Sequence, residues 1–477
     1  MQTPRAQLGD WAAAPGRADP VALLLSQEES RVSELVPVRH ARMAVSAFTF
    51  YRGSALVMAS DLAGLPRTML TAQLCGDAHL SNFGLFGAPD RSVVFDVNDF
   101  DETHPGPFDW DVKRLATSFV LAARDNGLPN RDGLAAAAAV AASYRQTMTS
   151  FAGKTELDLW YHRVEQSQLD ATVQEIATRK QRELATKNSS KTHRDVEKAI
   201  EKARARDAWS VIEKITEVVE GRRRFRHQPP LLDRVQANAD VASMVHDLYE
   251  QYRSTLQDDR QELLSRYEIV DIGHKVVGVG SVGLLAFALL MRGRDEDDLM
   301  VLQVKQAQAS VLEGFTLAST YAQHGQRVVT GQRLMQAASD SFLGWVQGPS
   351  GRSYYVRQLR DMKWAPDPAT LTGSGLNRYA LLCGHTLARA HARSGDAVAI
   401  AAYLGSGSSF DRAIEAFSAA YADQVRHDFQ AFTTAISDSR ITATEEAAGG
   451  EGLRGARQAT TLTTPQPPRR QRAASRS

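Results

Sequence analysis

The fold is decided by two neighbouring stretches of the chain, QLCGDAHLSNFGLF at residues 73–86 and VVFDVNDFDET at residues 93–103. Both place acidic and amide side chains between short apolar runs that have the character of strands. Strand ends direct such side chains into one small volume, where like charges need a partner such as a metal ion. We therefore expect a shared site for the polar residues of these stretches, which are Asp77, His79, Asn82, Asp96, Asp99 and Asp101.

Composition limits the classes of protein to which the chain can belong. Its 477 residues are 43% hydrophobic, which suits two or three compact lobes. Lys and Arg number 56 and Asp and Glu 55, so the charge balance gives no reason to expect a nucleic acid partner. Two cysteines, Cys75 and Cys383, are too few for a disulfide-stapled secreted protein. The start of the chain lacks the apolar core of a signal peptide and no apolar run is long enough for a membrane span, so we expect a cytoplasmic protein.

Periodicity and composition divide the chain into six segments, with the bounds 1–35, 36–154, 155–265, 266–365, 366–440 and 441–477. The first segment is polar and contains prolines, so we expect it to be loosely held, and the last is rich in Gly, Pro, Thr and Arg and is expected to be disordered. The second holds the two acid-rich stretches, and the third is expected to be a helical subdomain whose helical pattern runs through residues 194–221. The fourth alternates like strands and the fifth returns to helical spacing. The predicted fold class is α+β.

The segment GVGSVG has glycines at G-x-G-x-x-G spacing, namely Gly278, Gly280 and Gly283. Such glycines let backbone amides approach phosphate oxygens, either in a dinucleotide-binding turn or in the hairpin that covers the phosphates of ATP. The pattern alone is weak evidence, because a tight turn without a ligand has the same spacing.

Lys305 favours the ATP hairpin. It lies in the strand pattern MVLQVKQA, where an ammonium without a counter-charge is costly, and ATP-binding hairpins carry a lysine in the third strand. Glu313 is the nearest candidate for its acidic partner. The competing interpretation is a surface lysine on an edge strand. The residues expected at the nucleotide are Gly278, Gly280, Ser281, Gly283, Lys305 and Glu313.

The spacing within GDAHLSN indicates phosphoryl transfer. Asp77 precedes Asn82 by five residues, as the catalytic Asp precedes the magnesium-binding Asn of kinase catalytic loops. The Asp accepts or positions the proton of the substrate hydroxyl, and the Asn oxygen joins the metal shell. Asp99 follows an apolar strand, in the position of a second metal-binding acid. Hard oxygen ligands of this kind suit magnesium better than zinc.

These motifs, together with GQRLMQAASDSFLGW, YYVRQLRDMKW and LARAHARSGD, resemble a bacterial family of unknown function, the domain of unknown function 2252, over about residues 20–440. The two opening stretches in turn resemble the HGDxHxxN and IDFDD segments of aminoglycoside-phosphotransferase-like kinases. The resemblance implies Asp77 as catalytic base, Asn82 and Asp99 as metal ligands, Asp101 as a further ligand or its support, His79 as a loop-shaping residue, Lys305 as the phosphate-pairing lysine, and Asp111 as the residue that opens a helix and hydrogen-bonds the catalytic loop. The His that usually precedes Gly-Asp in these kinases is Cys75 here.

The order of the motifs differs from that of an ordinary kinase, in which the glycine loop and the lysine precede the catalytic loop. Here the catalytic loop comes first and the glycine turn follows. A circular permutation produces such an order. We therefore expect a two-lobed protein-kinase-like fold in permuted order with a helical insertion, in which the helix that ends near His391 lies beside the loop at Cys75.

The expected function is ATP- and magnesium-dependent phosphoryl transfer to an unknown hydroxyl-bearing acceptor. Two alternatives stay open: an inactive nucleotide-binding regulator, and a metal-dependent hydrolase that uses Asp77, His79, Asp96, Asp99 and His104. A nucleophilic thiol at Cys75 is a further idea, against which stands the usual role of a free cysteine as a small buried apolar residue. The sequence sets no oligomeric state.

Overall fold

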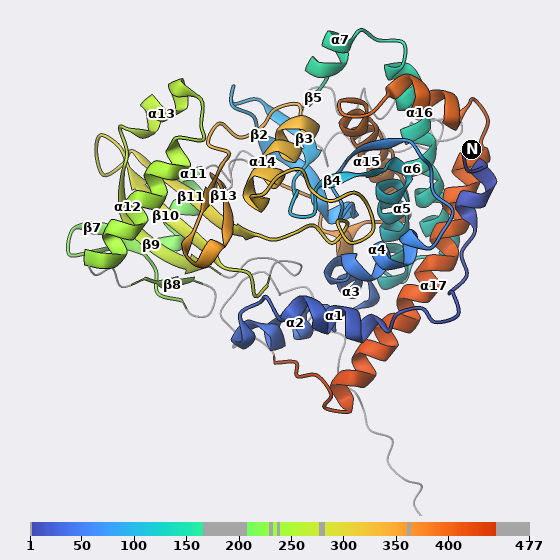
Figure 1. Ribbon diagram of the computed structural model, residues 1–477, viewed down its shortest axis with the longest axis horizontal. Coiled ribbons are helices and arrows are strands. Elements are labelled where there is room, and N and C mark those ends of the chain that lie inside the picture. The colour runs from blue at the N-terminus through green and yellow to red at the C-terminus, as the bar shows by residue number, and fades with distance from the viewer. Residues whose placement is uncertain are drawn as a thin grey trace, which may run out of the picture. The chain divides into compact units, whose positions relative to one another are not determined.

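The computed structural model describes residues 2–165, 208–228, 232–235, 239–275, 282–359 and 364–444. Residues Met1–Glu445 form one compact unit. Its helices and strands are mixed along the chain, in agreement with the predicted α+β class (Figure 1). None of the described helices combines the length and the apolar character that a bilayer crossing requires.

Long helices form one side of the unit, shown on the right of Figure 1. They are α5 (Phe108–Asp125), α6 (Asn130–Phe151), α15 (Gly373–Ala392) and α17 (Ser409–Ser437), with the shorter α16 (Ala397–Leu404) beside them. Gly384 of α15 lets that helix approach α6 closely, because a Cβ there would lie 2.4 Å from the Val140 carbonyl oxygen. This packing builds the largest core cluster, which also takes in the strands that carry the opening motifs.

A six-stranded sheet forms the other side and is antiparallel throughout. In sheet order its strands are β12 (Gly344–Gln347), β13 (Ser353–Gln358), β11 (Leu299–Ala307), β10 (Ala286–Arg292), β9 (Glu268–Lys275) and β8 (Leu232–Arg234). Aliphatic runs without helical spacing form β10 and β11, the central strands of the sheet. Helix α14 (His324–Met335) connects β11 to β12 and packs against β12 and β13.

Short strands hold the two opening stretches. Strand β1 (Thr71–Leu74) pairs with β4 (His104–Pro107), and β2 (Phe83–Gly87) pairs with β3 (Val93–Val97), which β5 (Val164–Glu165) extends. The loop from β1 to β2 contains the one-turn helix η3 (Leu80–Asn82), and the loop from β3 to β4 spans residues 98–103. Both loops therefore leave neighbouring strand ends, as the sequence predicts.

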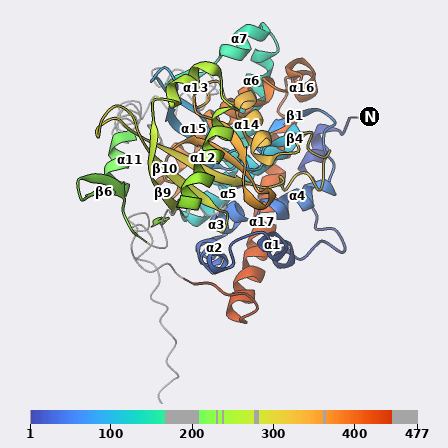
Figure 2. The same ribbon diagram turned by 60° about the vertical axis from the view of Figure 1, so that its left-hand side comes forward.

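The N-terminal segment differs from the loosely held chain expected there. Within residues 1–35 the elements are η1 (Arg5–Gly9), α1 (Pro20–Glu28) and η2 (Ser33–Leu35). The helices α2 (Val36–Met43), α3 (Ala47–Gly53) and α4 (Ala55–Ala63) follow in the second predicted segment. Leu8 and Leu24 are buried in the main core, and Arg17 bridges Asp61 and Asp428 with N–O distances of 2.7 Å. Figure 2 shows α1 beside α17. The prediction of a loosely held segment was based on local polarity. It was wrong because the few apolar residues of this segment, such as Leu8 and Leu24, are buried where η1 and α1 pack against α17.

The block expected to be helical, 155–265, contains strands as well. Its described elements are α7 (Glu156–Tyr161), β5, α11 (Ala208–Ile215), β6 (Thr216–Val219), β7 (Arg222–Phe225), β8, α12 (Ala239–Arg253) and α13 (Asp258–Leu264). The helix predicted over 194–221 ends at Ile215, because the β-branched residues that follow pair as a hairpin. Strand β8 joins the large sheet through β9. The rest of that predicted helix, up to residue 207, lies outside the described residues.

The predicted tail starts later than residue 441. Ile441 is buried, the Thr442 carbonyl oxygen lies 2.7 Å from His40 Nδ1, and Thr444 N–H donates to the Pro37 carbonyl. Residues 445–477 lie outside the described residues.

Candidate functional site

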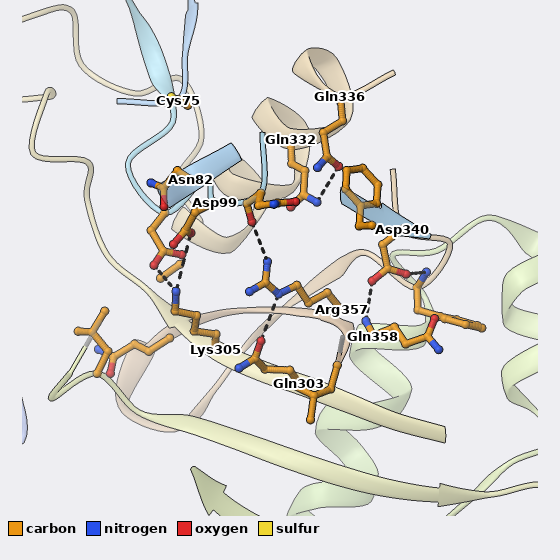
Figure 3. Close-up of a pocket in the computed structure, with 18 of the residues that line it drawn as sticks. Cys75, Asn82, Asp99, Gln303, Lys305, Gln332, Gln336, Asp340, Arg357 and Gln358 are labelled. Atoms are coloured by element: carbon orange, nitrogen blue, oxygen red, sulfur yellow. Dashed lines mark hydrogen bonds and ion pairs between the residues drawn. The ribbon is translucent and has the colours of Figure 1, made fainter. Parts of the chain in front are cut away.

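A cleft of about 880 Å³ lies between the large sheet and the loops that leave β1 and β3. Six residues singled out in the sequence line it, namely Asp77, His79, Asn82, Asp99, Asp101 and Lys305. Figure 3 shows the Lys305 side chain directed toward Asp99, with Asn82 on the far side of that carboxylate. The chain fold therefore brings together residues from two distant parts of the sequence.

The loop that carries Asp77 depends on a glycine and on two distant side chains. Gly76 has φ +79°, and a Cβ there would lie 2.1 Å from the Glu102 carbonyl oxygen. Asp111, in the first turn of α5, accepts hydrogen bonds from the N–H groups of Cys75 (2.8 Å) and Gly76 (3.1 Å). His391 Nε2 lies 3.2 Å from the same carboxylate. The end of α15 thus lies beside the loop at Cys75, which confirms the predicted adjacency, and Asp111 makes the loop contacts expected of it.

Arg114 holds the Asp77 carboxylate. Its Nε donates to Asp77 Oδ1 over 2.6 Å, and its Nη2 donates to the Tyr51 carbonyl over 2.9 Å. Burial raises the pKa of Asp77, and the charge of Arg114 opposes that shift. Since Oδ1 is engaged, Oδ2 is the oxygen left to take part in chemistry.

His79 packs beside Asp77 without bonding to it, because its Nε2 is 3.7 Å from Asp77 Oδ2. Burial, with the charges of Arg52 and Arg114, holds the pKa of His79 well below its usual value. The imidazole is therefore neutral, which agrees with a residue that shapes the loop.

Asn82 is oriented by the main chain. Its side-chain Nδ2 donates to the main-chain carbonyl oxygen of Asp77 over 2.8 Å. The main-chain carbonyl oxygen of Asn82 accepts from Asn98 N–H over 2.8 Å. The amide oxygen of the side chain is left as an acceptor or ligand toward the cleft that it lines. The second hydrogen bond also ties the loop of Asp77 to the loop of Asp99.

Two acids face Lys305. Its Nζ pairs with Asp101 Oδ2 and lies 4.0 Å from Asp99 Oδ1. Tyr355 OH donates to Asp101 Oδ1 over 2.8 Å. Burial lowers the pKa of Lys305, but the charges of Asp101 and Asp99 outweigh it and the net shift is upward, so the lysine is an ammonium. Asp99 Oδ1 is buried without a hydrogen-bond partner among the described residues.

The expected partner of Lys305, Glu313, does not contact it. Glu313 accepts from Ser310 N–H over 2.9 Å and lies 3.6 Å from Arg327 Nε. Its position after the end of β11 points it toward α14 and away from the lysine. The acid that pairs with Lys305 instead comes from the other half of the chain, so proximity along the sequence could not identify it.

Only one of the three glycines of the motif lies among the described residues. Gly283 has φ +90°, a backbone conformation that favours glycine, and its carbonyl accepts from Val32 N–H over 2.8 Å. It does not line the cleft. Gly278, Gly280 and Ser281 lie outside the described residues.

Helix α14 contributes a buried arginine that the sequence analysis missed. Arg327 donates to the carbonyl oxygens of Thr103, Asp101 (2.8 Å) and Gln308 (2.7 Å). It therefore fixes the loop that presents Asp101. A cation directly before the apolar pair Val328 and Val329 in a helical pattern was the available indication in the sequence.

The cleft has an excess of positive charge that the composition of the whole chain does not indicate. Among its lining residues are eight Arg and Lys, namely Arg31, Arg42, Arg52, Arg91, Arg260, Lys275, Lys305 and Arg357, against five acids, namely Asp77, Asp99, Asp101, Glu102 and Asp340. The whole chain has a formal charge of only +1, so this excess is local. Figure 3 shows Arg357 in the middle of the cleft beside Gln303, to which its Nε donates over 3.2 Å. A cleft of this charge favours anionic ligands.

The acid and histidine cluster of the hydrolase alternative does not assemble. Asp96 forms a buried ion pair with Arg389, and His104 Nε2 lies 2.7 Å from the Leu317 carbonyl oxygen. Within the described ranges, no three His, Cys, Asp or Glu side chains converge as metal ligands. Burial, followed by the charge of Asp111, raises the pKa of the Cys75 thiol well above its usual value, which disfavours a nucleophilic thiolate.

Comparison with known proteins gives one match. A family model described as an uncharacterized protein conserved in bacteria (DUF2252) matches residues 31–435. No curated protein and no solved structure matches the chain.

Proposed function

The chain belongs to the DUF2252 family of uncharacterised bacterial proteins, and we propose that it is an ATP- and magnesium-dependent phosphotransferase with a kinase-like site assembled in permuted order. The observation that carries the proposal is the meeting of Asp77, Asn82 and Asp99 with Lys305 in one cleft. These are the side chains that kinases use for the proton, the metal and the phosphates.

The arrangement of the sheet supports the nucleotide side of the proposal. Strands β9 and β10 pair in antiparallel fashion on either side of the glycine motif, and β11 pairs with β10. Lys305 lies on β11, the third strand of the series β9, β10 and β11 whose first two strands flank the glycines, as in protein kinases. Because Asp101 and Tyr355 hold the lysine within the cleft, its charge is in place for phosphate oxygens.

The oxygen ligands suit magnesium. Asp99 Oδ1 is a buried carboxylate oxygen without a hydrogen-bond partner among the described residues, and Asn82 presents an amide oxygen to the same cleft. Asp99 and Asn82 would hold the ion, which when bound neutralises charge on the phosphate oxygens. Asp101 is engaged by Lys305 and Tyr355, so we assign to it the support of the lysine.

Asp77 has the geometry of the base. As the acceptor oxygen bonds to the terminal phosphorus of ATP and the bond from that phosphorus to ADP breaks, the hydroxyl proton passes to Asp77. Arg114 keeps Oδ1 engaged, which leaves Oδ2 to receive the proton. Catalysis of this kind relies on positioning and electrostatic stabilisation, so the few oriented groups of this cleft are sufficient.

The test is calorimetric titration of a non-hydrolysable ATP analogue, with magnesium and with EDTA. We expect binding that depends on magnesium, loss of that dependence in Asp99→Asn, and affinity about tenfold lower or more in Lys305→Ala. Lys154→Ala is the matched control, because Lys154 lies over the Phe151 ring and does not line the cleft.

Binding that is equal with EDTA, or an affinity unchanged in Lys305→Ala, would refute the proposal. Magnesium-dependent binding of ATP without any phosphate transfer would identify the regulator instead of the enzyme.

A further inference from the structure

Arg52 is one of the cations that line the cleft. It lies in the last turn of α3, lines the cleft, and makes no hydrogen bond or ion pair with any residue that the structure describes. Its Nε is buried, and its guanidinium carbon is 6.0 Å from the centre of the Phe48 ring. Arg52 is half-buried, and no described carboxylate lies within ion-pair distance of it. A partly desolvated guanidinium that lacks direct hydrogen bonds is costly, so this position is explained best by a ligand that accepts them.

The side of the cleft on which Arg52 lies is that of Asp77. Arg52 interacts electrostatically with Asp77 and Asp99, whereas the charged groups that act on Lys305 are Asp101, Asp99 and Arg357. Asp99 is common to both sets. The lysine side belongs to the phosphates of the nucleotide under the proposed function, which leaves the Arg52 side to the molecule that receives the phosphoryl group.

The neighbouring wall has the same charge. Residues 27–55 contribute Arg31, Arg42 and Arg52 to the cleft and no acid. Arg31 Nη1 donates to the Val282 carbonyl over 2.6 Å, while its Nε is buried without a hydrogen-bond partner among the described residues. Two buried guanidinium nitrogens with unused donors thus belong to one wall of the cleft.

We infer that this wall binds an anionic group, a carboxylate or a phosphate, of the acceptor, with Arg52 as its main contact. The identification of the bound molecule as the acceptor rests on the proposed function, but the anion site does not. The planar fork of arginine donates two parallel hydrogen bonds to such groups, and these charge-assisted bonds are among the stronger ones in proteins. The acceptor is therefore a hydroxyl compound that also carries a negative charge.

The experiment titrates inorganic phosphate, and separately acetate, into the full chain saturated with magnesium and the non-hydrolysable ATP analogue. Saturation occupies the nucleotide site, so the anion reports the remaining part of the cleft. We expect Arg52→Gln to weaken anion binding about tenfold or more and Arg52→Lys to weaken it less. Arg124→Gln serves as control, because Arg124 pairs with Asp423 at the surface and does not line the cleft. The arm that binds more tightly tells whether phosphate or carboxylate is preferred.

The outcomes separate the two proposals. Anion affinity that is equal in Arg52→Gln and the parent protein, or the absence of phosphate and acetate binding to the parent, overturns the inference. Reduced affinity of Arg52→Gln for the nucleotide analogue also overturns it, because Arg52 then serves the donor. The anion titration is repeated without nucleotide for the case in which the protein does not bind magnesium and ATP. If the anion still binds and its affinity depends on Arg52, the anion site is supported and the proposed phosphotransferase function is refuted.

Discussion

Asp77 is held through both its side chain and its main chain. Arg114 engages one carboxylate oxygen, and Asn82 Nδ2 binds the main-chain carbonyl. The carboxylate is thereby oriented before any substrate binds, which lowers the cost of organising the reaction. Because Asn82 uses its nitrogen for this contact, the residue that orients Asp77 keeps its amide oxygen for the magnesium ion of the proposed function.

Asp77→Asn should lower the rate of phosphate transfer by about 100-fold or more, since the amide cannot accept the proton. The affinity for the magnesium nucleotide should change little. Release of phosphate from ATP and calorimetric titration measure the two quantities. Asp90→Asn is the control, because Asp90 pairs with Arg163 outside the cleft. An equal loss of rate in both variants would remove Asp77 from the role of base.

Glu102 makes stability depend on pH. Burial raises the pKa of its carboxyl from 4.5 to about 7, although Val311 N–H donates to it. The folded state therefore binds more protons than the unfolded state in this window, so the contribution of Glu102 is fully present below pH 4.5 and is lost as the pH rises to about 7.

Glu102→Gln keeps the acceptor for Val311 and removes the titration. The free energy of unfolding of the variant should rise relative to that of the parent protein between pH 4.5 and about 7. The upper limit of this gain is about 3 kcal/mol, and the gain is smaller because the side chain is only half-buried. Urea unfolding at several pH values measures the difference. A difference that is constant over this range would contradict the assignment.

At the scale of elements, the turn after β1 decides where Asp77 lies. The positive φ of Gly76 and the closeness of the Glu102 carbonyl leave no room for a side chain. Helix α14 acts on the same region from the other side through Arg327, which binds three carbonyl oxygens. Turn and helix together set the distance between the loop of Asp77 and the loop of Asp101.

Comparison of Gly76→Ala with Gly127→Ala separates the cost of the close contact at Gly76 from the cost of a positive φ. Gly127 also has positive φ, +66°, but a Cβ there meets nothing within 4 Å. We expect Gly127→Ala to cost about 1 kcal/mol and Gly76→Ala clearly more, because the latter must also displace the Glu102 carbonyl. Urea unfolding of both variants measures the free energies, and equal losses would show that the close contact has no consequence.

At the scale of the whole unit, the first elements of the chain pack against the last described helix, α17. Residues from η1 and α1 pack against α17, and Arg17 joins Asp61 of α4 to Asp428 of α17. Removal of one partner from a buried ion pair is strongly destabilising, because the remaining charges stay buried. Residues 1–35 are therefore part of the core, and together with α2 and α3 they supply the arginine wall of the cleft.

Deletion of residues 2–18 should lower the free energy of unfolding by about 3 kcal/mol or more, since it removes Arg17 and the buried Leu8. Deletion of residues 446–477 should change it little, because the compact unit ends at Glu445. Thermal unfolding of both truncated proteins measures the effect. An unchanged melting temperature after the first deletion, or a large loss after the second, would contradict this assignment.

The sequence by itself determined the local elements and the residue types of the site. Apolar periodicity predicted strands within residues 266–365, where β9 to β13 lie, and helices within residues 366–440, where α15 to α17 lie. Spacing singled out Asp77, Asn82 and Asp99, because these patterns depend on residues that are close in the chain.

Only the tertiary structure decided which distant groups meet. Lys305 pairs with Asp101 and not with Glu313, and Arg114 and Arg327 hold the two loops. Local polarity suggested a loose N-terminal segment, whereas Leu8 and Leu24 are buried against other parts of the chain. Ion pairs and buried contacts depend on distances in space, and one sequence gives no distances between residues that are far apart along the chain.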